Sequence, residues 1–255
     1  MSAKLSIITI TYQAEKYLER TIQSVLTQGH RDAIEYIVID GASKDGTLVI
    51  IEKYTNQIDQ FVSEPDKGIY DAMNKGLQRA SGDYVIFMNA GDRFADEKTV
   101  GQLISAMESN PDVIVGDAMF VDEAGKTLGL RSEVTPHKIP TNLSWRSFQY
   151  GMVICHQSFV AKRNIAPLFD LHFRLSSDID WEIKCLKLAK EIVQIPAPIC
   201  QYLIGGASVQ NLKRSWQERF EVLKRHFGFG NALWSHLIII LRGINFARKK
   251  GGKYW

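Results

Sequence analysis

The chain of 255 residues is 45% hydrophobic and 23% charged. This composition is typical of soluble globular proteins and excludes an intrinsically disordered chain. Its three cysteines, Cys155, Cys185 and Cys200, form no CxxC pair, which argues against a disulfide scaffold or a zinc site and favours a reducing compartment. Residues 211–255 hold ten Lys or Arg against two Glu, a net charge of +8; because the whole chain carries +3, residues 1–210 carry −5. Such a basic tail favours an anionic partner, either a membrane surface or a nucleic acid.

The first hundred residues alternate between strand and helix patterns. Apolar runs predict strands at residues 5–11, 35–40, 57–64 and 83–90, and apolar residues at helical spacing predict helices over residues 14–28, 45–56 and 68–81. The first run leads into a charged helical pattern instead of a small-residue cleavage site, so we expect no export signal. This alternation predicts an α/β fold with a mostly parallel sheet flanked by helices.

The pattern changes from about Asp112 onwards. A strand and then a hairpin turning near Glu123–Gly125 are predicted, followed by a helix from Ser177 to Ala189 and strands at residues 192–195 and 199–203. The last segment predicts two helices that break at the "GFG" of residues 228–230.

Polar residues follow three of the predicted parallel strands. Thr11 and Tyr12 end the first, Asp40 ends the second, and Asn89 to Asp92 end the fourth. Ligands bind beyond the carboxyl ends of such strands, so we expect these residues to share one rim. Two interpretations of Asp40 stay open: a carboxylate that accepts a hydrogen bond from a base or ribose, or a turn residue opening "DGASKDG".

The segments around these strand ends carry further candidates. Ser43 and Asp45 are expected to cap the following helix, and the loop matches neither GxGxxG nor a P-loop, which argues against a dinucleotide enzyme and a kinase. In "SEPDKGIYDAMNKG", Lys67 either reaches an anion or is solvated. Asn74 shares a helix face with Asp71 and is expected to make a tertiary hydrogen bond, structural or to a ligand.

Four segments together resemble family-2 glycosyltransferases of the GT-A fold, most closely bacterial enzymes of polysaccharide, colanic-acid-type or lipid-linked glycan assembly. They are "SIITITYQAEKYLERTIQSVLTQ", "EYIVIDGASKDGT", "SEPDKGIYDAMNKGLQRASGDYVIFMNAGD" and "HQSFVAKRNI…FDLHFRLSSDIDWEIK", in the family's order across residues 4 to about 208. The resemblance implies a Rossmann-like GT-A catalytic domain over residues 1–210, with a nucleotide-binding half over about 1–110 and an acceptor half over about 111–210. A basic amphipathic helical tail, residues 211–255, would follow.

The resemblance also assigns roles to residues. Thr11, Tyr12 and Asp40 match positions that hold the base and ribose of a nucleotide-sugar donor, and Asn89 to Asp92 match the family's metal motif. Asp178 matches the catalytic base. His156 and Gln157 match an "HQ" motif that lines the cleft, where His156 would contact acceptor or phosphate; the alternative for His156 is a satisfied buried histidine. The "GGAS" of residues 205–208 matches a late loop near the site.

These roles imply an inverting transfer of a sugar from a UDP- or dTDP-sugar to a hydroxyl of a glycan or lipid-linked acceptor, with an oxocarbenium-like transition state. A positioned Asp accepts the proton of the acceptor hydroxyl. Asp178 and Asp180 lie about 200° apart around a helix, so only one can face the cleft. The family match selects Asp178 and leaves Asp180 as a cap or structural acid.

The metal motif is incomplete in this chain. Asn89 and Gly91 stand where the family often has aspartates, and Asp92 is the remaining acid. Mg²⁺ often takes one or two protein carboxylates and keeps several waters, so we expect a weak Mg²⁺ or Mn²⁺ site at Asp92 that depends on the donor. The alternative is that Lys67 or another base neutralises the leaving diphosphate without a metal.

Apolar residues lie largely along one side of the last helix. Leu233, Trp234, Leu237, Ile238, Leu241, Ile244 and Phe246 make this side, interrupted by His236, Arg242 and Asn245. The stretch falls short of the ~20 residues of a membrane span. Two interpretations stay open: residues 231–255 dock on an anionic membrane surface, or the helix packs on the domain. We expect a cytoplasmic protein, peripheral on the inner face of the membrane in the first case.

Other functions compete with transfer. A sugar-1-phosphate nucleotidyltransferase would need a glycine-rich basic loop after the first strand, which "TYQAEKYL" lacks. A catalytically weak or inactive nucleotide-sugar-binding or glycan-binding protein of the same fold is the main alternative, since the acid motif is eroded. No nucleic-acid partner is expected, because no aromatic and basic recognition surface accompanies the tail. The sequence leaves the oligomeric state open.

Overall fold

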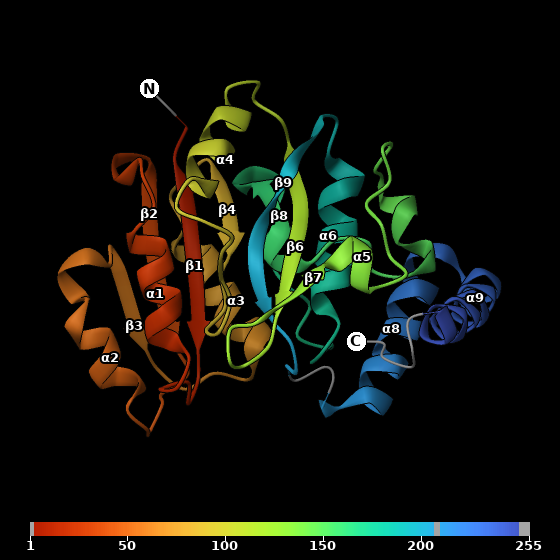
Figure 1. Ribbon diagram of the computed structural model, residues 1–255, viewed down its shortest axis with the longest axis horizontal. Coiled ribbons are helices and arrows are strands. Elements are labelled where there is room, and N and C mark those ends of the chain that lie inside the picture. Colours follow the sequence, from red (N-terminus) through yellow and green to blue (C-terminus); the bar gives the residue numbers. More distant parts are fainter. Residues whose placement is uncertain (1–2, 207–209, 250–255) are drawn as a thin grey trace.

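The computed structural model describes residues 3–206 and 210–249 of the chain, with one sheet at its centre (Figure 1). The strand order is β3-β2-β1-β4-β8-β6-β9-β5, and β7 pairs with β6. The strands β3, β2, β1 and β4 are parallel to one another, whereas β8, β5 and β7 pair antiparallel. The α/β class is confirmed; the sheet is parallel in its N-terminal part and mixed beyond β4. It joins the two predicted halves of the catalytic domain, whose division near residue 110 remains a prediction.

The bounds of the elements are as follows. The strands are β1 (Leu5–Thr11), β2 (Ile34–Asp40), β3 (Gln60–Ser63), β4 (Tyr84–Phe87), β5 (Arg93–Phe94), β6 (Val113–Val121), β7 (Thr127–Leu130), β8 (Phe159–Lys162) and β9 (Ile192–Leu203). The helices are α1 (Leu18–Leu26), α2 (Thr47–Lys53), α3 (Ile69–Arg79), α4 (Thr99–Met107), α5 (Arg131–Val134), α6 (Ser177–Leu188), α8 (Leu212–Phe227) and α9 (Phe229–Lys249).

Helices cover both faces of the sheet because the central strands are apolar on both sides. Every residue of β1 is buried: Leu5 and Ile7 face the core shared with α1 and α4, while Ile8 and Ile10 face the core shared with α3 and α6. Successive strand residues point to opposite faces, so a continuous apolar run fills two layers at once. Because β1, β2, β3 and β4 run in the same direction, their carboxyl ends lie at one edge of the sheet.

Several boundaries differ from the sequence-based prediction. One continuous strand, β9, replaces the two strands predicted at residues 192–195 and 199–203, and the helix α4 and the short strand β8 were not predicted. The N-cap residue of α2 is Gly46 and not Asp45, but the Asp45 carboxylate accepts a hydrogen bond from the N–H of Thr47, the first residue of the helix, at 3.1 Å. The expectation that Ser43 caps this helix is wrong, since its hydroxyl donates to Asp40 at 2.5 Å instead.

The predicted C-terminal extension is present as two helices. The chain breaks between α8 and α9 at Gly228, whose φ of +84° favours glycine. These helices lie at the end of the molecule opposite α2 and β3 (Figure 1). Within the described ranges, no helix has both the length and the apolar character needed to cross a bilayer. Lys250 and Lys253 of the basic tail lie outside the described residues.

Candidate active site

The tips of β1, β2 and β4 meet as the sequence predicts. Thr11 is the register partner of Asp40, and the Ala90 N–H donates to Ile10 O at 3.1 Å, which brings the segment after β4 beside the end of β1. The buried side-chain oxygens Thr11 Oγ1 and Asn89 Oδ1 find no hydrogen-bond partner within residues 3–206 and 210–249. Buried polar atoms are nearly always satisfied, so these two oxygens make this edge of the sheet a candidate site for polar groups of a ligand.

Asp40 organises the loop beside this edge. Its fully buried carboxylate accepts hydrogen bonds from the Ser43 N–H at 3.0 Å, the Ser43 hydroxyl at 2.5 Å and the Ser63 hydroxyl at 2.6 Å. Both of its oxygens are therefore engaged by the protein, and the carboxylate ties the loop after β2 to the end of β3. The exposed ring of Tyr12 lies over Gly41, where an added Cβ would meet it at 3.2 Å.

Asp178 lies at the first turn of α6, half-buried. Its carboxylate accepts hydrogen bonds from the Tyr70 phenol at 3.0 Å and from the Ile179 N–H at 2.9 Å. Burial raises the pKa of Asp178, against the opposing effect of these donors and of the Arg219 charge. A partly exposed carboxyl group with a raised pKa is a candidate for proton transfer.

Asp180 points away from Asp178, as the helical spacing predicts. It is buried in an ion-pair cluster with Lys184 at 2.6 Å and His226 at 2.8 Å, which lowers the pKa of Asp180 despite its burial. Asp180 is therefore a structural acid that joins α6 to α8.

Asp92 is enclosed by its neighbours. It is buried, and its two carboxylate oxygens accept hydrogen bonds from the Leu203 N–H at 2.9 Å and the Gln157 side chain at 2.8 Å. Burial raises the pKa of Asp92 to about 7, so the carboxyl is only partly ionised at neutral pH. These bonds tie the tip of β4 to the end of β9.

His156 lies inside an aromatic cluster. Its ring is 4% exposed and stands 5.2 Å from Phe87, 5.4 Å from Trp181 and 5.7 Å from Phe169 between centroids. Burial lowers the pKa of His156 to about 3, so the ring is neutral, and Nδ1 lies 3.4 Å from the buried carboxyl of Glu182. Contact with an acceptor would require this aromatic wall to open, and it stays a prediction.

The comparisons with known proteins agree with this geometry. A sequence-family model, Glycosyl transferase family 2, matches residues 6–166. An uncharacterized glycosyltransferase of Mycobacterium tuberculosis is 32% identical over 249 residues, which cover 95% of this chain and 91% of that protein. This chain belongs to glycosyltransferase family 2.

Other similarities are consistent with this assignment. The putative teichuronic acid biosynthesis glycosyltransferase TuaG of Bacillus subtilis is 39% identical over 108 residues, which cover 41% of this chain and 42% of TuaG. Residues 1–349 of S. aureus TarS, solved with UDP-GlcNAc, superpose with a TM-score of 0.71 at 17% identity, covering 97% of this chain and 74% of that one. The mannosyltransferase PcManGT of Pyrobaculum calidifontis, solved with GDP-Man and Mn²⁺, gives 0.67 at 16% identity, covering 100% of this chain and 77% of that one. These two structural likenesses show the fold.

The residues of this glycosyltransferase do not fit a preformed metal centre. No group of three or more His, Cys, Asp or Glu side chains that could hold an ion occurs in the described parts of the chain. Asp92 offers one carboxyl, already engaged through both oxygens, whereas Mg²⁺ and Mn²⁺ prefer a near-octahedral set of free oxygen ligands. The expected weak, donor-dependent site therefore has a single protein ligand that would first have to release its partners.

We accordingly expect Mn²⁺ alone to bind the glycosyltransferase only weakly. Isothermal titration of Mn²⁺ into the free protein should give a dissociation constant in the millimolar range or no measurable heat, because the Asp92 oxygens are hydrogen-bonded and its pKa is raised to about 7. Titration in the presence of UDP is the comparison. Micromolar binding without nucleotide would contradict this account of Asp92.

Four side chains of the glycosyltransferase site were not predicted. Tyr70 binds Asp178, and Asp66 accepts a hydrogen bond from the Gly68 N–H at 2.8 Å. Arg174 donates to the Lys67 carbonyl at 3.4 Å, which sets a second exposed cation beside exposed Lys67. Burial raises the pKa of Tyr202, and the charges of Cys155, Asp92 and Asp178 raise it further.

Two further features predicted from the sequence are Asn74, on α3, and the late "GGAS" loop. Asn74 holds the backbone of Phe169 through two hydrogen bonds of 3.0 and 2.7 Å, which is the structural role considered for it. Of the "GGAS" loop, Gly205 and Gly206 are described and residues 207 and 208 lie outside the described residues. Gly206 lies near Tyr202, since an added Cβ would stand 3.7 Å from its phenol oxygen.

Proposed function

We propose that this family-2 glycosyltransferase catalyses an inverting transfer of a sugar from a UDP- or dTDP-sugar to a hydroxyl of a glycan or lipid-linked acceptor in bacterial polysaccharide assembly. The observation that carries the proposal is Asp178, a half-buried carboxyl with a raised pKa, which accepts a hydrogen bond from the Tyr70 phenol at the start of α3 at 3.0 Å. The similarity to TuaG, a putative teichuronic acid biosynthesis glycosyltransferase, and to TarS, solved with UDP-GlcNAc, supports the substrate class.

The donor would lie along the strand tips. Thr11 Oγ1 and Asn89 Oδ1 are the buried oxygens without partners there, and the exposed Tyr12 ring offers a flat apolar surface to a base. Asp40 shapes this place by holding the loop of residues 41–46, and any direct bond from Asp40 to the nucleotide would share an oxygen with Ser43 or Ser63.

The chemistry assigned to Asp178 is removal of one proton. As the acceptor oxygen forms its bond to the anomeric carbon, the hydroxyl proton passes to the Asp178 carboxylate, and the bond from that carbon to the diphosphate breaks on the opposite face. The electron pair of the broken bond leaves with the diphosphate. His156 and Gln157 serve this site through their neighbours: Gln157 holds Asp92, and His156 supports the aromatic wall beside α6.

The leaving diphosphate needs positive charge, and two exposed cations, Lys67 and Arg174, lie together just before α3. The two sit on either side of Gly68, whose added Cβ would be 4.0 Å from the Arg174 guanidinium. Lys67 and Arg174 would balance the negative charge of the diphosphate, with or without a metal.

A thermal-shift screen of nucleotide sugars tests the donor assignment. Binding only to the folded state raises stability by mass action, so a UDP- or dTDP-sugar at 100 times its dissociation constant should raise the melting temperature by roughly 5–10 °C. Free UDP is the comparison ligand, and GDP-sugars are the mismatched control. No shift with any nucleotide sugar would overturn the proposal, whereas a shift without measurable donor turnover would favour the catalytically inactive binding protein.

Replacing Tyr70 by Phe tests the support of the base. The phenol stabilises the Asp178 carboxylate and thereby lowers its pKa, so Tyr70→Phe should move the acid limb of the pH–rate profile to higher pH. We expect the rate at neutral pH to fall by roughly fivefold to tenfold, the value of about one hydrogen bond. Tyr54→Phe is the matched control, because it removes a phenol bonded to the Glu19 carboxylate at 3.1 Å, away from the rim. Equal profiles for Tyr70→Phe and Tyr54→Phe would contradict this role.

A further inference from the structure

The outer face of α9 is apolar and largely exposed, and it contacts α8 only near its start within the described residues, where the Phe229 ring stands 6.0 Å from the Phe220 ring. Seven large apolar side chains between 40% and 63% exposed lie on it: Phe229, Leu233, Trp234, Leu237, Ile240, Leu241 and Ile244. At 100° per residue they fall within an arc of about 140°, and they extend along most of a helix about 30 Å long. We call these seven residues the outer face.

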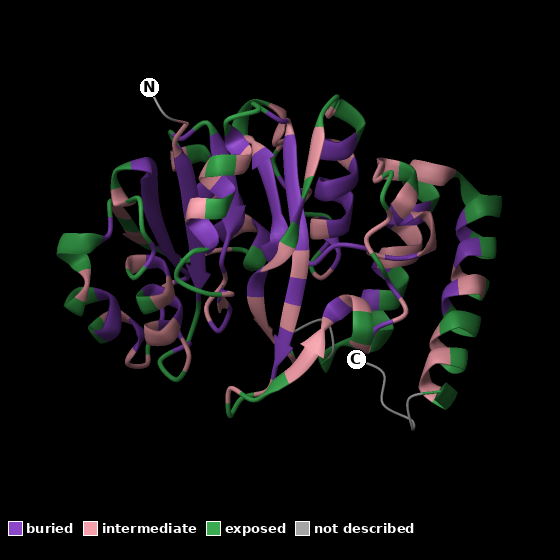
Figure 2. Cartoon of the chain, turned by 45° about the horizontal axis from the view of Figure 1, so that its top comes forward, coloured by how far each residue is buried: buried purple, intermediate pink, exposed green. Residues whose placement is uncertain are grey.

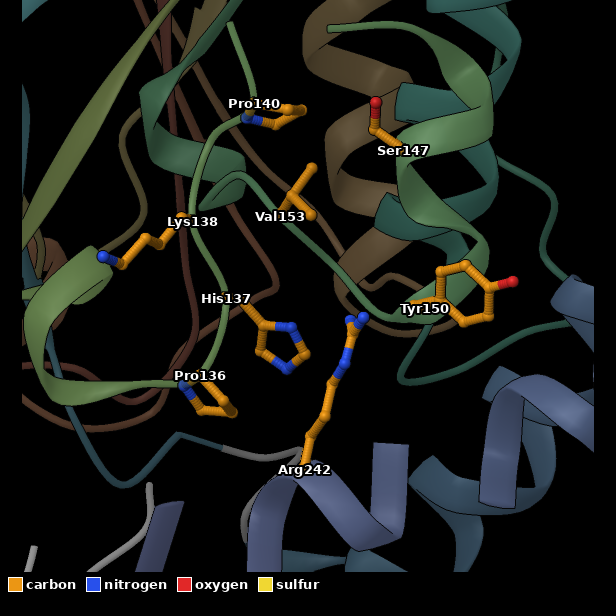
Figure 3. Close-up of a pocket in the computed structure, with 8 residues that line it drawn as sticks. All are labelled: Pro136, His137, Lys138, Pro140, Ser147, Tyr150, Val153 and Arg242. Atoms are coloured by element: carbon orange, nitrogen blue, oxygen red, sulfur yellow. The ribbon is translucent and has the colours of Figure 1, made fainter. Parts of the chain in front are cut away.

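The inner side of α9 explains why the outer face is directed away from the domain. Buried Ala232, Ser235 and Ile239 pack toward α8. Arg242 reaches back into a cavity of about 210 Å³, where its guanidinium lies 5.3 Å from the ring centroid of Tyr150 and beside His137 (Figure 3). The helix is therefore anchored on its inner side, and α9 forms an edge of the molecule with repeated exposed positions (Figure 2).

The structure corrects the composition predicted for this surface. Phe229 and Ile240 belong to it, whereas Ile238 and Phe246 are half-buried and lie outside it. The surface continues onto α8, because the Trp216 ring, 38% exposed, stands 6.0 Å from His236 on α9. Two tryptophans, Trp216 and Trp234, thus border one continuous apolar area. Contiguous exposed apolar surface of this kind marks an interaction site.

The charges of α8 and α9 indicate which kind of partner fits the outer face. The helix α9 contains no Asp or Glu and ends in exposed Arg248 and Lys249, and exposed Lys213 lies at the start of α8. The acids of α8 are already paired, Glu218 with Arg214 at 2.8 Å and Glu221 with Lys224 at 2.8 Å. A second copy of the chain that met this one through its own α8 and α9 would bring further cations, and the acids of its α8 would already be paired. An anionic bilayer offers both an apolar layer and negative headgroups.

We propose that the outer face of α9 docks this protein on an anionic lipid bilayer, with the helix lying in the plane of the interface. Trp234 and the leucines enter the boundary between headgroups and acyl chains, and Arg248 and Lys249 contact the headgroups. This docking is independent of the transfer reaction and would hold the enzyme beside a membrane surface whatever its acceptor is.

Co-sedimentation of the full chain with lipid vesicles tests the proposal. The protein should pellet with vesicles that contain phosphatidylglycerol and only weakly with pure phosphatidylcholine, and added salt should weaken the binding. Leu237→Glu, at the centre of the outer face, should lower the partition coefficient about tenfold or more. Asn231→Glu adds the same charge to the same helix but outside the outer face, and it should change the partition coefficient by less than about threefold.

Further variants and measurements separate membrane docking from folding, donor binding and dimerisation. Arg248→Gln with Lys249→Gln should reduce binding to anionic vesicles and leave binding to neutral vesicles unchanged. Leu237→Glu should keep the melting temperature and the nucleotide-sugar thermal shift of the wild type, which separates docking from folding and from the donor site. Equal pelleting of wild type and Leu237→Glu, or failure of the wild type to bind anionic vesicles, would overturn the proposal. So would a dimer in sedimentation equilibrium that Leu237→Glu dissociates, because a second copy would then be the occupant.

Discussion

Replacing Asp178 by Asn is expected to lower the rate of sugar transfer by about 10²- to 10⁴-fold, the range that a positioned general base contributes. The amide has nearly the shape of the carboxyl, so the Ile179 and Tyr70 contacts can be kept by one oxygen while the proton acceptor is lost. Donor binding should persist, because the buried oxygens offered to the donor belong to β1 and the segment after β4. The measurement is the rate of UDP release with acceptor, beside the thermal shift with donor.

Asp180→Asn is the matched control for this substitution. It changes the same residue type two positions along α6, but in the cluster with Lys184 and His226. It should lower the melting temperature and leave the rate per folded enzyme close to that of the wild type. If Asp178→Asn retains more than about a tenth of the wild-type rate, Asp178 is not the base.

The pH dependence of the rate follows from the same carboxyl. Burial raises the pKa of Asp178 above that of an ordinary aspartate, and only the ionised form accepts a proton. The rate should therefore fall on the acid side as pH drops through this raised pKa, at a higher pH than an exposed aspartate would give.

Replacing Asp40 by Ala is expected to cause the second large effect, a combined loss of stability and of donor affinity. The substitution leaves the Ser43 N–H and the hydroxyls of Ser43 and Ser63 without their acceptor in a fully buried place. One buried donor without an acceptor costs about 1–3 kcal/mol, and with some relaxation we expect the free energy of unfolding to fall by about 3 kcal/mol. The loop of residues 41–46 should loosen, and donor affinity should fall at least about tenfold.

Asp45→Ala controls for charge and loop position. Its carboxylate accepts hydrogen bonds at the exposed side of the same loop, from the N–H groups of Thr47 and Glu15. Asp45→Ala should lower the free energy of unfolding by about 1 kcal/mol, the value of a capping hydrogen bond at a helix start. Donor affinity should stay within about threefold of the wild type. Chemical denaturation gives the stability change, and thermal shift gives the affinity. Equal effects of the two substitutions would contradict the role given to Asp40.

The local pattern of the chain predicted much of its fold. The strands that end at Thr11, Asp40 and Phe87, the hairpin of β6 and β7, the helix α6 and the break at Gly228 all follow from apolar periodicity and turn residues. The strand β8 was missed because its four residues follow "HQS" without alternation, and β9 was divided because two prolines interrupt it.

The site required contacts between distant parts of the chain. Tyr70 and Asp178 are 108 positions apart, and no local pattern joins them. The engagement of Asp92 by Gln157 and Leu203 depends on how β9 lies against the segment after β4, which sequence spacing does not fix. His156 has the family's motif position, but its burial depends on aromatic residues of three other segments.

A crystal structure of the protein with a bound UDP-sugar would test the central claim most directly. We predict that the nucleotide lies against Thr11, Asp40 and Asn89, and that the Asp178 carboxylate faces the side of the anomeric carbon opposite the diphosphate. A nucleotide bound elsewhere, or a sugar whose anomeric carbon is shielded from Asp178 by the protein, would contradict this.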